Sequence, residues 1–230
     1  MTKGLDPDVP MKDSGIPWIG EIPAHWEVKK LKYVCKVESG HTPNRSKLEY
    51  WLDDECVIPW VSLNDTATLA RADEIYETAY RISSRGMLNS SAHLIDKGAV
   101  VFTRDATVGL AAILGVEAAV SQHVIAWVCG SRMFNRYLLR VVDAMRGELD
   151  RLTFGATIQT IGMRDIRQLV SPVPPIEEQR SVSIYVKKQL DSLARIRGLY
   201  SKQIDRLKEY RQALITQAVT GQIAIPAPKA

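Results

Sequence analysis

Hydrophobic residues follow two different patterns, one on each side of the segment Ser171-Pro172-Val173-Pro174-Pro175. Before it, short runs rich in β-branched residues alternate with turns, at lengths typical of strands. These runs are 56–61, 98–102, 119–120 and 123–128. Between 135 and 152, apolar residues recur instead at helical spacing: Leu138, Leu139, Val142, Met145 and Leu149. Mixed strands and helices predict a globular domain of the α/β or α+β class over residues 1–172, with α/β as the expected class.

After the prolines, residues 173–221 are predicted to form one long helix. Apolar side chains recur in steps of three and four, as in the seam of a coiled coil, at Val182, Val186, Leu190, Leu193, Ile196, Tyr200, Ile204, Leu207, Leu214 and Ala218. The pattern has one break, between Leu207 and Leu214, where Tyr210 or Arg211 must serve. Pro174 and Pro175 favour a helix start, Glu177 and Glu178 suit its positive end, and Gly221 favours its end. Residues 222–230 are expected to be a disordered tail.

A helix of some 44 residues makes a rod of roughly 65 Å. A domain of about 170 residues cannot cover an apolar stripe of that length, and the sequence contains no second helix of similar length. The stripe therefore predicts a partner helix from another chain, and a single solvated helix is the alternative.

Composition and charge refine this picture. Hydrophobic residues make up 46% and charged residues 24% of the 230 positions, as in globular proteins, which excludes a wholly disordered chain. No apolar run is long enough to span a bilayer, and the first ten residues lack the apolar region of a signal peptide, so we expect a cytoplasmic location. From Ile176 onward ten Lys and Arg residues face five acids, which predicts a polyanionic or acidic partner.

Residues for catalysis or metal binding are sparse. The four histidines lie far apart, and Cys35, Cys56 and Cys129 are isolated, so we expect buried free thiols, no metal and no cofactor. No glycine-rich phosphate-binding loop is present. One alternative stays open, a metal-dependent nuclease or other DNA-modifying enzyme. Glu27-Val28-Lys29 fits the Glu-x-Lys pattern of such nucleases, although this tripeptide is common by chance.

Four polar loops, 40–47, 62–65, 103–109 and 155–160, are candidates for nucleic-acid contact. Arg, Asn, Gln, Ser and Thr side chains match the geometry of base edges and phosphate oxygens. Each loop taken alone could equally be a solvated turn. The candidate DNA-binding residues are Thr42, Asn44, Arg45, Lys47, Ser62, Asn64, Arg104, Thr107, Thr157 and Gln159.

Several motifs in order carry a family resemblance. They include SGIPWIGEIP at 14–23, the loop 40–45, RDATVG at 104–109, GAT at 155–157, PPIEEQR at 174–180 and LKEYRQALI at 207–215. With these motifs, nearly the whole chain resembles the specificity subunit of type I restriction–modification systems. The resemblance implies an α/β target-recognition domain over 1–172, which reads one half of a split double-stranded DNA site, followed by one long coiled-coil-forming helix.

The resemblance also implies partners. The helix would dock modification subunits, and through them restriction subunits, together with a second specificity unit, using Val186, Leu190, Leu193, Ile196, Tyr200, Ile204, Leu207 and Leu214. It implies no catalytic residue here, because methyl transfer and cleavage belong to the other subunits. A third possibility is a structural coiled-coil adaptor without DNA affinity.

This chain carries one recognition unit, whereas a complete subunit has two. Residues 2–14 resemble the linker that follows the first helix of such subunits. We therefore expect a C-terminal half, and the alternative is a natural half-subunit that dimerises. Both would leave the same open chain, so the sequence does not choose between them.

Overall fold

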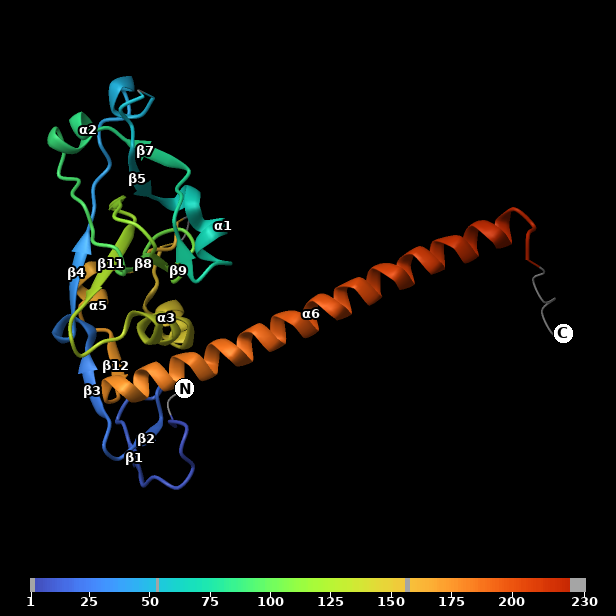
Figure 1. Ribbon diagram of the computed structural model, residues 1–230, viewed down its shortest axis with the longest axis horizontal. Helices are drawn as coiled ribbons and strands as arrows, with labels where there is room; N and C mark the ends of the chain where they lie inside the picture. The colour runs from blue at the N-terminus through green and yellow to red at the C-terminus, as the bar shows by residue number, and fades with distance from the viewer. Residues whose placement is uncertain (1–2, 53, 156–157, 224–230) are drawn as a thin grey trace. The chain divides into compact units, whose positions relative to one another are not determined.

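The computed structural model describes residues 3–52, 54–155 and 158–223 (Figure 1). The chain divides into two compact units, Met1–Ile184 and Tyr185–Ala230. This division lies within the long helix α6 (Ile176–Val219), about three turns beyond the proline segment at which the sequence pattern changes. The predicted fold class, an α/β domain followed by a long helix, is confirmed.

The first unit is built on a five-stranded sheet with strand order β4-β11-β8-β9-β6. Its strands are β4 (Cys35–Ser39), β11 (Val124–Cys129), β8 (Val100–Thr103), β9 (Ala111–Leu114) and β6 (Glu74–Ile75). All neighbours are antiparallel except β6 and β9. Every residue of β8 and β9 is buried, which explains why these segments are almost continuously apolar.

The other strands form three smaller sheets. β10 (Ala119–Val120), β5 (Ile58–Val61) and β7 (Tyr80–Ile82) form one sheet in that order. β1 (Met11–Asp13) pairs with β2 (Glu21–Pro23), and β3 (Glu27–Lys30) pairs with β12 (Val170–Val173). In Figure 1 the β5–β7 sheet lies at one end of this unit and the β1–β2 hairpin at the other, with the five-stranded sheet between them.

Helices cover and connect the sheets. They are α1 (Thr66–Leu69), α2 (Ser84–Leu88), α3 (Asn135–Ala144), α4 (Arg146–Leu152) and α5 (Met163–Ile166), with 3-10 turns η1 (Leu31–Tyr33), η2 (Leu48–Tyr50) and η3 (Leu63–Asp65). α3 packs against β8 and β9 through its buried face. The predicted helix over 135–152 is therefore two helices, which are divided at Met145.

The remaining expectations have mixed outcomes. The predicted strands and the long helix are present, and Gly221 follows α6 with a φ of 72°. The prediction of three buried thiols is wrong for Cys56 and Cys129, which are partly exposed, and correct for Cys35. Most of the expected tail, 224–230, lies outside the described residues. Among the helices described, none is both long and apolar enough to cross a membrane.

Candidate nucleic-acid interface

A chain of side-chain hydrogen bonds joins the loops that follow the strands. Thr42 Oγ1 donates to Gln122 Oε1, and Gln122 Nε2 lies 3.1 Å from His123 Nε2. His123 Nδ1 lies 2.6 Å from Asp105 Oδ2, and the Thr160 hydroxyl donates to Asp105 Oδ1. These partners fit the neutral histidine tautomer with its proton on Nδ1. We call these five residues the polar chain. It connects loops that lie up to 118 residues apart in the sequence.

Backbone hydrogen bonds fix the same loops to one another. The Arg104 amide donates to the His123 carbonyl at 3.0 Å, and the Arg104 carbonyl accepts from Ile161 at 2.9 Å. The Ala106 amide donates to the Gln159 carbonyl at 2.8 Å. Loops 103–109, 121–123 and 159–161 are therefore held together by main-chain bonds as well as by the polar chain.

Gly40 lets the fourth loop join this cluster. A Cβ atom at Gly40 would lie 1.6 Å from the carbonyl oxygen of Val120, so only glycine allows this close approach. The next residue, His41, accepts a hydrogen bond at its carbonyl from Trp60 Nε1 at 3.1 Å. Loop 40–47 is thereby anchored to β5 and β10 where it leaves β4.

Arg45 lies over a group of aromatic rings. The centre of its guanidinium is 3.9 Å from the ring centroid of Trp51 and 5.0 Å from those of Trp60 and Tyr80. The residue as a whole is exposed. Stacking occupies the faces of a guanidinium and leaves its in-plane N–H groups available, so Arg45 is oriented and can still donate to an anion.

Arg104 is held in a different way. Its side chain is 22% exposed, and Nε lies 3.8 Å from Asp105 Oδ1, which is too far for a hydrogen bond. Nε is buried and has no hydrogen-bond partner within the described parts of the chain. Because Nε itself is closed to solvent, a bound ligand would meet the exposed part of the Arg104 side chain.

The other predicted contact residues divide by exposure. Asn44, Lys47, Asn64, Thr107 and Gln159 are exposed, whereas Thr42 is half-buried in the polar chain. Thr157 lies outside the described residues.

Ser62 does not fit its predicted role. It is only 3% exposed, and its hydroxyl accepts from the Asn64 amide at 3.3 Å, while Asp65 Oδ2 accepts from the Ser62 amide at 2.8 Å. These reciprocal bonds form a capping box at η3. The prediction of a DNA contact at Ser62 is corrected, because the side chain is buried and serves the local fold.

Four members of the polar chain are not in the predicted set: Asp105, Gln122, His123 and Thr160. The available signal was the polar step Ser121-Gln122-His123 between two apolar runs, but His123 was assigned to the second run. In the structure β11 begins only at Val124, so His123 belongs to the loop.

A second polar arrangement fixes the start of α6 within the first unit. Gln179 is fully buried, and its Oε1 accepts from the Phe134 amide at 2.8 Å. Its Nε2 donates to the carbonyls of Arg132 and Pro174 at 2.8 and 2.9 Å. The glutamine of the PPIEEQR motif therefore holds the helix start through all of these bonds.

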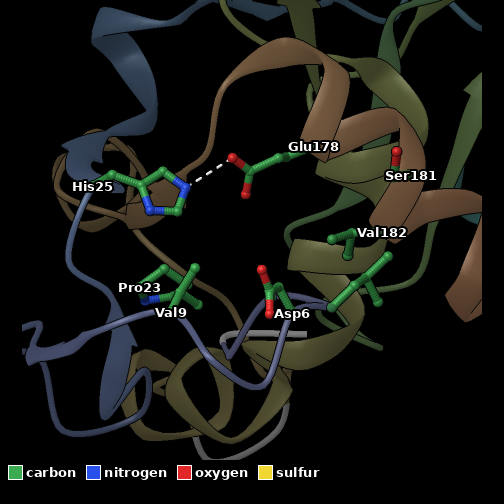
Figure 2. A pocket seen from close by; sticks show the side chains of 9 residues that line it. Asp6, Val9, Pro23, His25, Glu178, Ser181 and Val182 are labelled. Carbon is green, nitrogen blue, oxygen red and sulfur yellow. Dashed lines mark hydrogen bonds and ion pairs between the residues drawn. The ribbon is translucent and has the colours of Figure 1, made fainter.

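Glu178, the residue before Gln179, also attaches the start of α6 to the first unit, and Figure 2 shows its contact with His25. Its Oε1 lies 2.7 Å from His25 Nε2, and its Oε2 accepts from Trp26 Nε1 at 2.8 Å. A pocket of about 260 Å³ lies beside this contact, and Asp6 and Val182 are among its lining residues. Val182 is itself buried, so the exposed part of the apolar stripe begins after it.

The nuclease candidate has no support in this arrangement. Glu27 pairs with Lys29 at 3.0 Å and with Arg132 at 2.9 Å, and hydrogen bonds from Arg132 and then Lys29 lower the pKa of the Glu27 carboxyl. Within the ranges that the structure describes, no group of three or more His, Cys, Asp and Glu side chains could hold a metal ion.

The predicted partner residues of α6 are exposed in this chain, except for half-buried Val186. Leu193 is 60% and Leu207 is 59% exposed. The other exposed members are Leu190, Ile196, Tyr200, Ile204 and Leu214.

Comparison of sequences gives three informative matches. The family described as "Type I restriction modification DNA specificity domain" matches residues 23–199. The type I restriction enzyme MjaIX specificity subunit of Methanocaldococcus jannaschii is 28% identical over 169 residues, which cover 72% of this chain and 38% of that protein. The EcoR124I/EcoR124II specificity subunit of Escherichia coli is 25% identical over 174 residues, 73% of this chain and 41% of that protein.

Solved structures share the fold. A chain from a structure of the type I R-M system, solved to explain complex assembly and conformational transition, covers 94% of this chain with a TM-score of 0.69 and 19% identity. The HsdS subunit from Thermoanaerobacter tengcongensis covers 93% with a TM-score of 0.65 and 19% identity. The chain spans 48% of each of these structures and less than half of both sequence relatives.

Proposed function

This chain belongs to the family of type I restriction modification DNA specificity domains, and from that premise we propose that it reads one half of a bipartite DNA sequence. The observation that carries this proposal is the cluster of four loops held together by the polar chain. Arg104 lies in this cluster with its side chain 22% exposed. A ligand rich in hydrogen-bond acceptors, such as a DNA groove edge or a phosphate, suits the donors of this cluster.

Within this proposal residues 1–172 form the target-recognition domain. Arg104 and Arg45 supply cationic donors, which suit guanine edges or phosphate oxygens. Asn44, Asn64 and Gln159 add amide groups, which can both donate to and accept from base edges. The other exposed contacts are Lys47 and Thr107.

The helix 173–221 serves as the scaffold for partners. Its exposed stripe would pack against a helix of a second specificity unit and against modification subunits, since apolar surface of this regularity gains free energy only when it is buried. The chain itself is non-catalytic in this proposal and acts in the cytoplasm. Methyl transfer and cleavage are carried out by the partner subunits.

Selection of bound duplexes from a random pool, with and without the modification subunits, tests the proposal. We expect enrichment of one short half-site, strengthened by the modification subunits. If no sequence is enriched and random duplexes are retained only at background level, the chain does not bind DNA. The structural adaptor would then be the better explanation.

A nicking assay on plasmid with Mg²⁺ or Mn²⁺ tests the non-catalytic part. Purified chain should leave the plasmid supercoiled. Sustained cleavage that is lost in Glu27→Gln would support the nuclease alternative instead.

A further inference from the structure

Two of the three cysteines lie directly opposite each other in the five-stranded sheet. Cys35 of β4 is the register partner of Cys129 of β11. The Gly130 amide donates to the Val34 carbonyl at 3.1 Å, so Cys35 and Cys129 form a non-hydrogen-bonded pair of the antiparallel ladder. In such pairs the Cα atoms are about 4.5 Å apart, within the range of about 4.4–6.8 Å that disulfides span.

The two thiols differ in access. Cys35 is 4% exposed, whereas Cys129 is partly exposed and lines an open pocket of about 330 Å³. Lys97, a cationic side chain, is another of its lining residues. A small disulfide that carries carboxylates could therefore reach Cys129 but not Cys35.

We propose that Cys35 and Cys129 are a modification site, at which oxidised glutathione or a similar low-molecular-weight disulfide forms a reversible cross-strand disulfide. This proposal is independent of the DNA-binding function. It depends on the register of β4 and β11 and on the pocket beside Cys129.

The reaction proceeds by two thiol–disulfide exchanges. The Cys129 thiolate attacks one sulfur of oxidised glutathione, whose S–S bond breaks, and the first glutathione leaves as a thiolate that takes up a proton. Cys35 then loses its proton and attacks the Cys129 sulfur, and the second glutathione leaves in the same way. Two protein thiols are oxidised and one glutathione disulfide is reduced to two thiols.

The order of the two steps follows from the environment of Cys35. Its hydrogen bond with Cys129 and its burial raise the pKa of the Cys35 thiol, so it is a poor first nucleophile. Once the mixed disulfide exists, its sulfur lies directly opposite Cys35. This proximity makes Cys35 the resolving thiol.

The bridge would join two residues that are 94 positions apart in the sequence. The other three strands of the five-stranded sheet, β6, β8 and β9, lie between them in the sequence. A cross-link of this span restricts the unfolded chain strongly, so oxidation should raise the denaturation midpoint. The pair lies at the opposite end of β4 and β11 from Gly40 and Gln122, so the polar chain should keep its geometry.

The test treats the full-length reduced chain with oxidised glutathione and then counts free thiols and maps disulfide-linked peptides without reduction. We expect the free thiols to fall from three to one, with the Cys35 peptide linked to the Cys129 peptide and Cys56 left free. Dithiothreitol should restore all three. A retained glutathione adduct on wild-type Cys129, or a linkage that involves Cys56, would overturn the proposal.

Single serine variants separate the two steps. Cys35→Ser should accumulate a stable glutathione adduct on Cys129, because the resolving thiol is missing. Cys129→Ser should leave Cys35 unmodified, and the matched control Cys56→Ser should form the bridge as the wild type does. Rapid modification of Cys35 in folded Cys129→Ser would contradict the assigned order and the proposal with it.

Discussion

The loop cluster of the first unit and the exposed stripe of α6 present opposite kinds of surface. In the loop cluster, polar groups from distant segments bond to one another, and Arg104 Nε is buried beside Asp105 without a hydrogen-bond partner in the described parts of the chain. In α6 beyond residue 185, large apolar side chains such as Leu193 and Leu207 lie exposed. The loop cluster therefore offers hydrogen-bonding groups to a ligand, whereas the stripe of α6 offers uncovered apolar surface.

This difference separates two tasks. Directional hydrogen bonds discriminate between ligands, because a wrong partner leaves buried groups unpaired. Apolar area discriminates little but contributes much free energy when it is covered. The loop cluster is therefore suited to reading a sequence, and the stripe is suited to holding a protein partner.

The largest expected effect concerns the stripe. Changing Leu193 and Leu207 together to Asp should abolish self-association, because burial of each leucine contributes roughly 1.5–3 kcal/mol. Sedimentation at micromolar concentration measures it. The first unit should keep its unfolding midpoint, since both residues lie outside Met1–Ile184.

The matched control places the same acids on the opposite face of the helix, with Arg195→Asp and Lys202→Asp. These variants should associate as the wild type does. A wild-type chain that is monomeric and also does not bind the modification subunits would contradict the scaffold role of the stripe.

The next effect concerns the attachment of the loop cluster. Gly40→Ala would place a Cβ atom against the Val120 carbonyl, and this backbone contact cannot relax through a side chain. We expect a loss of about 3 kcal/mol in the free energy of unfolding, measured in denaturant. Gly147→Ala is the control, because nothing lies within 4 Å of its added Cβ and a helical alanine should gain up to about 1 kcal/mol. Equal stability of the two variants would contradict the close approach at Gly40.

A smaller loss is expected at the start of α6. Gln179→Ala leaves the Phe134 amide and the carbonyls of Arg132 and Pro174 without their side-chain partner, so the first unit should lose about 1–3 kcal/mol. Chemical denaturation followed by tryptophan fluorescence measures it. The exposed Gln203→Ala, in the same helix, should leave stability within about 0.5 kcal/mol.

Much of the fold could be predicted because its signals are local. The apolar runs that became β5, β8 and β11 are short and bounded by turn residues, and the three-and-four spacing after Pro175 extends through α6. The break at Met145 was missed, because the apolar spacing continues through both α3 and α4. Sheet order was not predictable either, since it depends on pairing between distant segments.

The candidate site could be predicted only as loops. Residue type within polar loops selected Thr42, Arg45 and Arg104, but the same signal selected Ser62, whose hydroxyl is used in a local cap. The partners that define the site, such as Asp105 with His123 or Arg45 with Tyr80, are long-range contacts. No local pattern specifies them.

The most direct test of the central claim is the affinity of Arg104→Ala for its selected half-site and for single-base variants of that site, measured across salt concentrations. A bidentate contact with guanine predicts a loss of about 1–3 kcal/mol and relaxed selectivity at one base pair. A phosphate contact predicts uniform weakening and a salt slope lower by about one. Either result supports DNA binding by the loop cluster, and relaxed selectivity at one base pair supports sequence reading by Arg104. Unchanged affinity and selectivity in both Arg104→Ala and Arg45→Ala would contradict it.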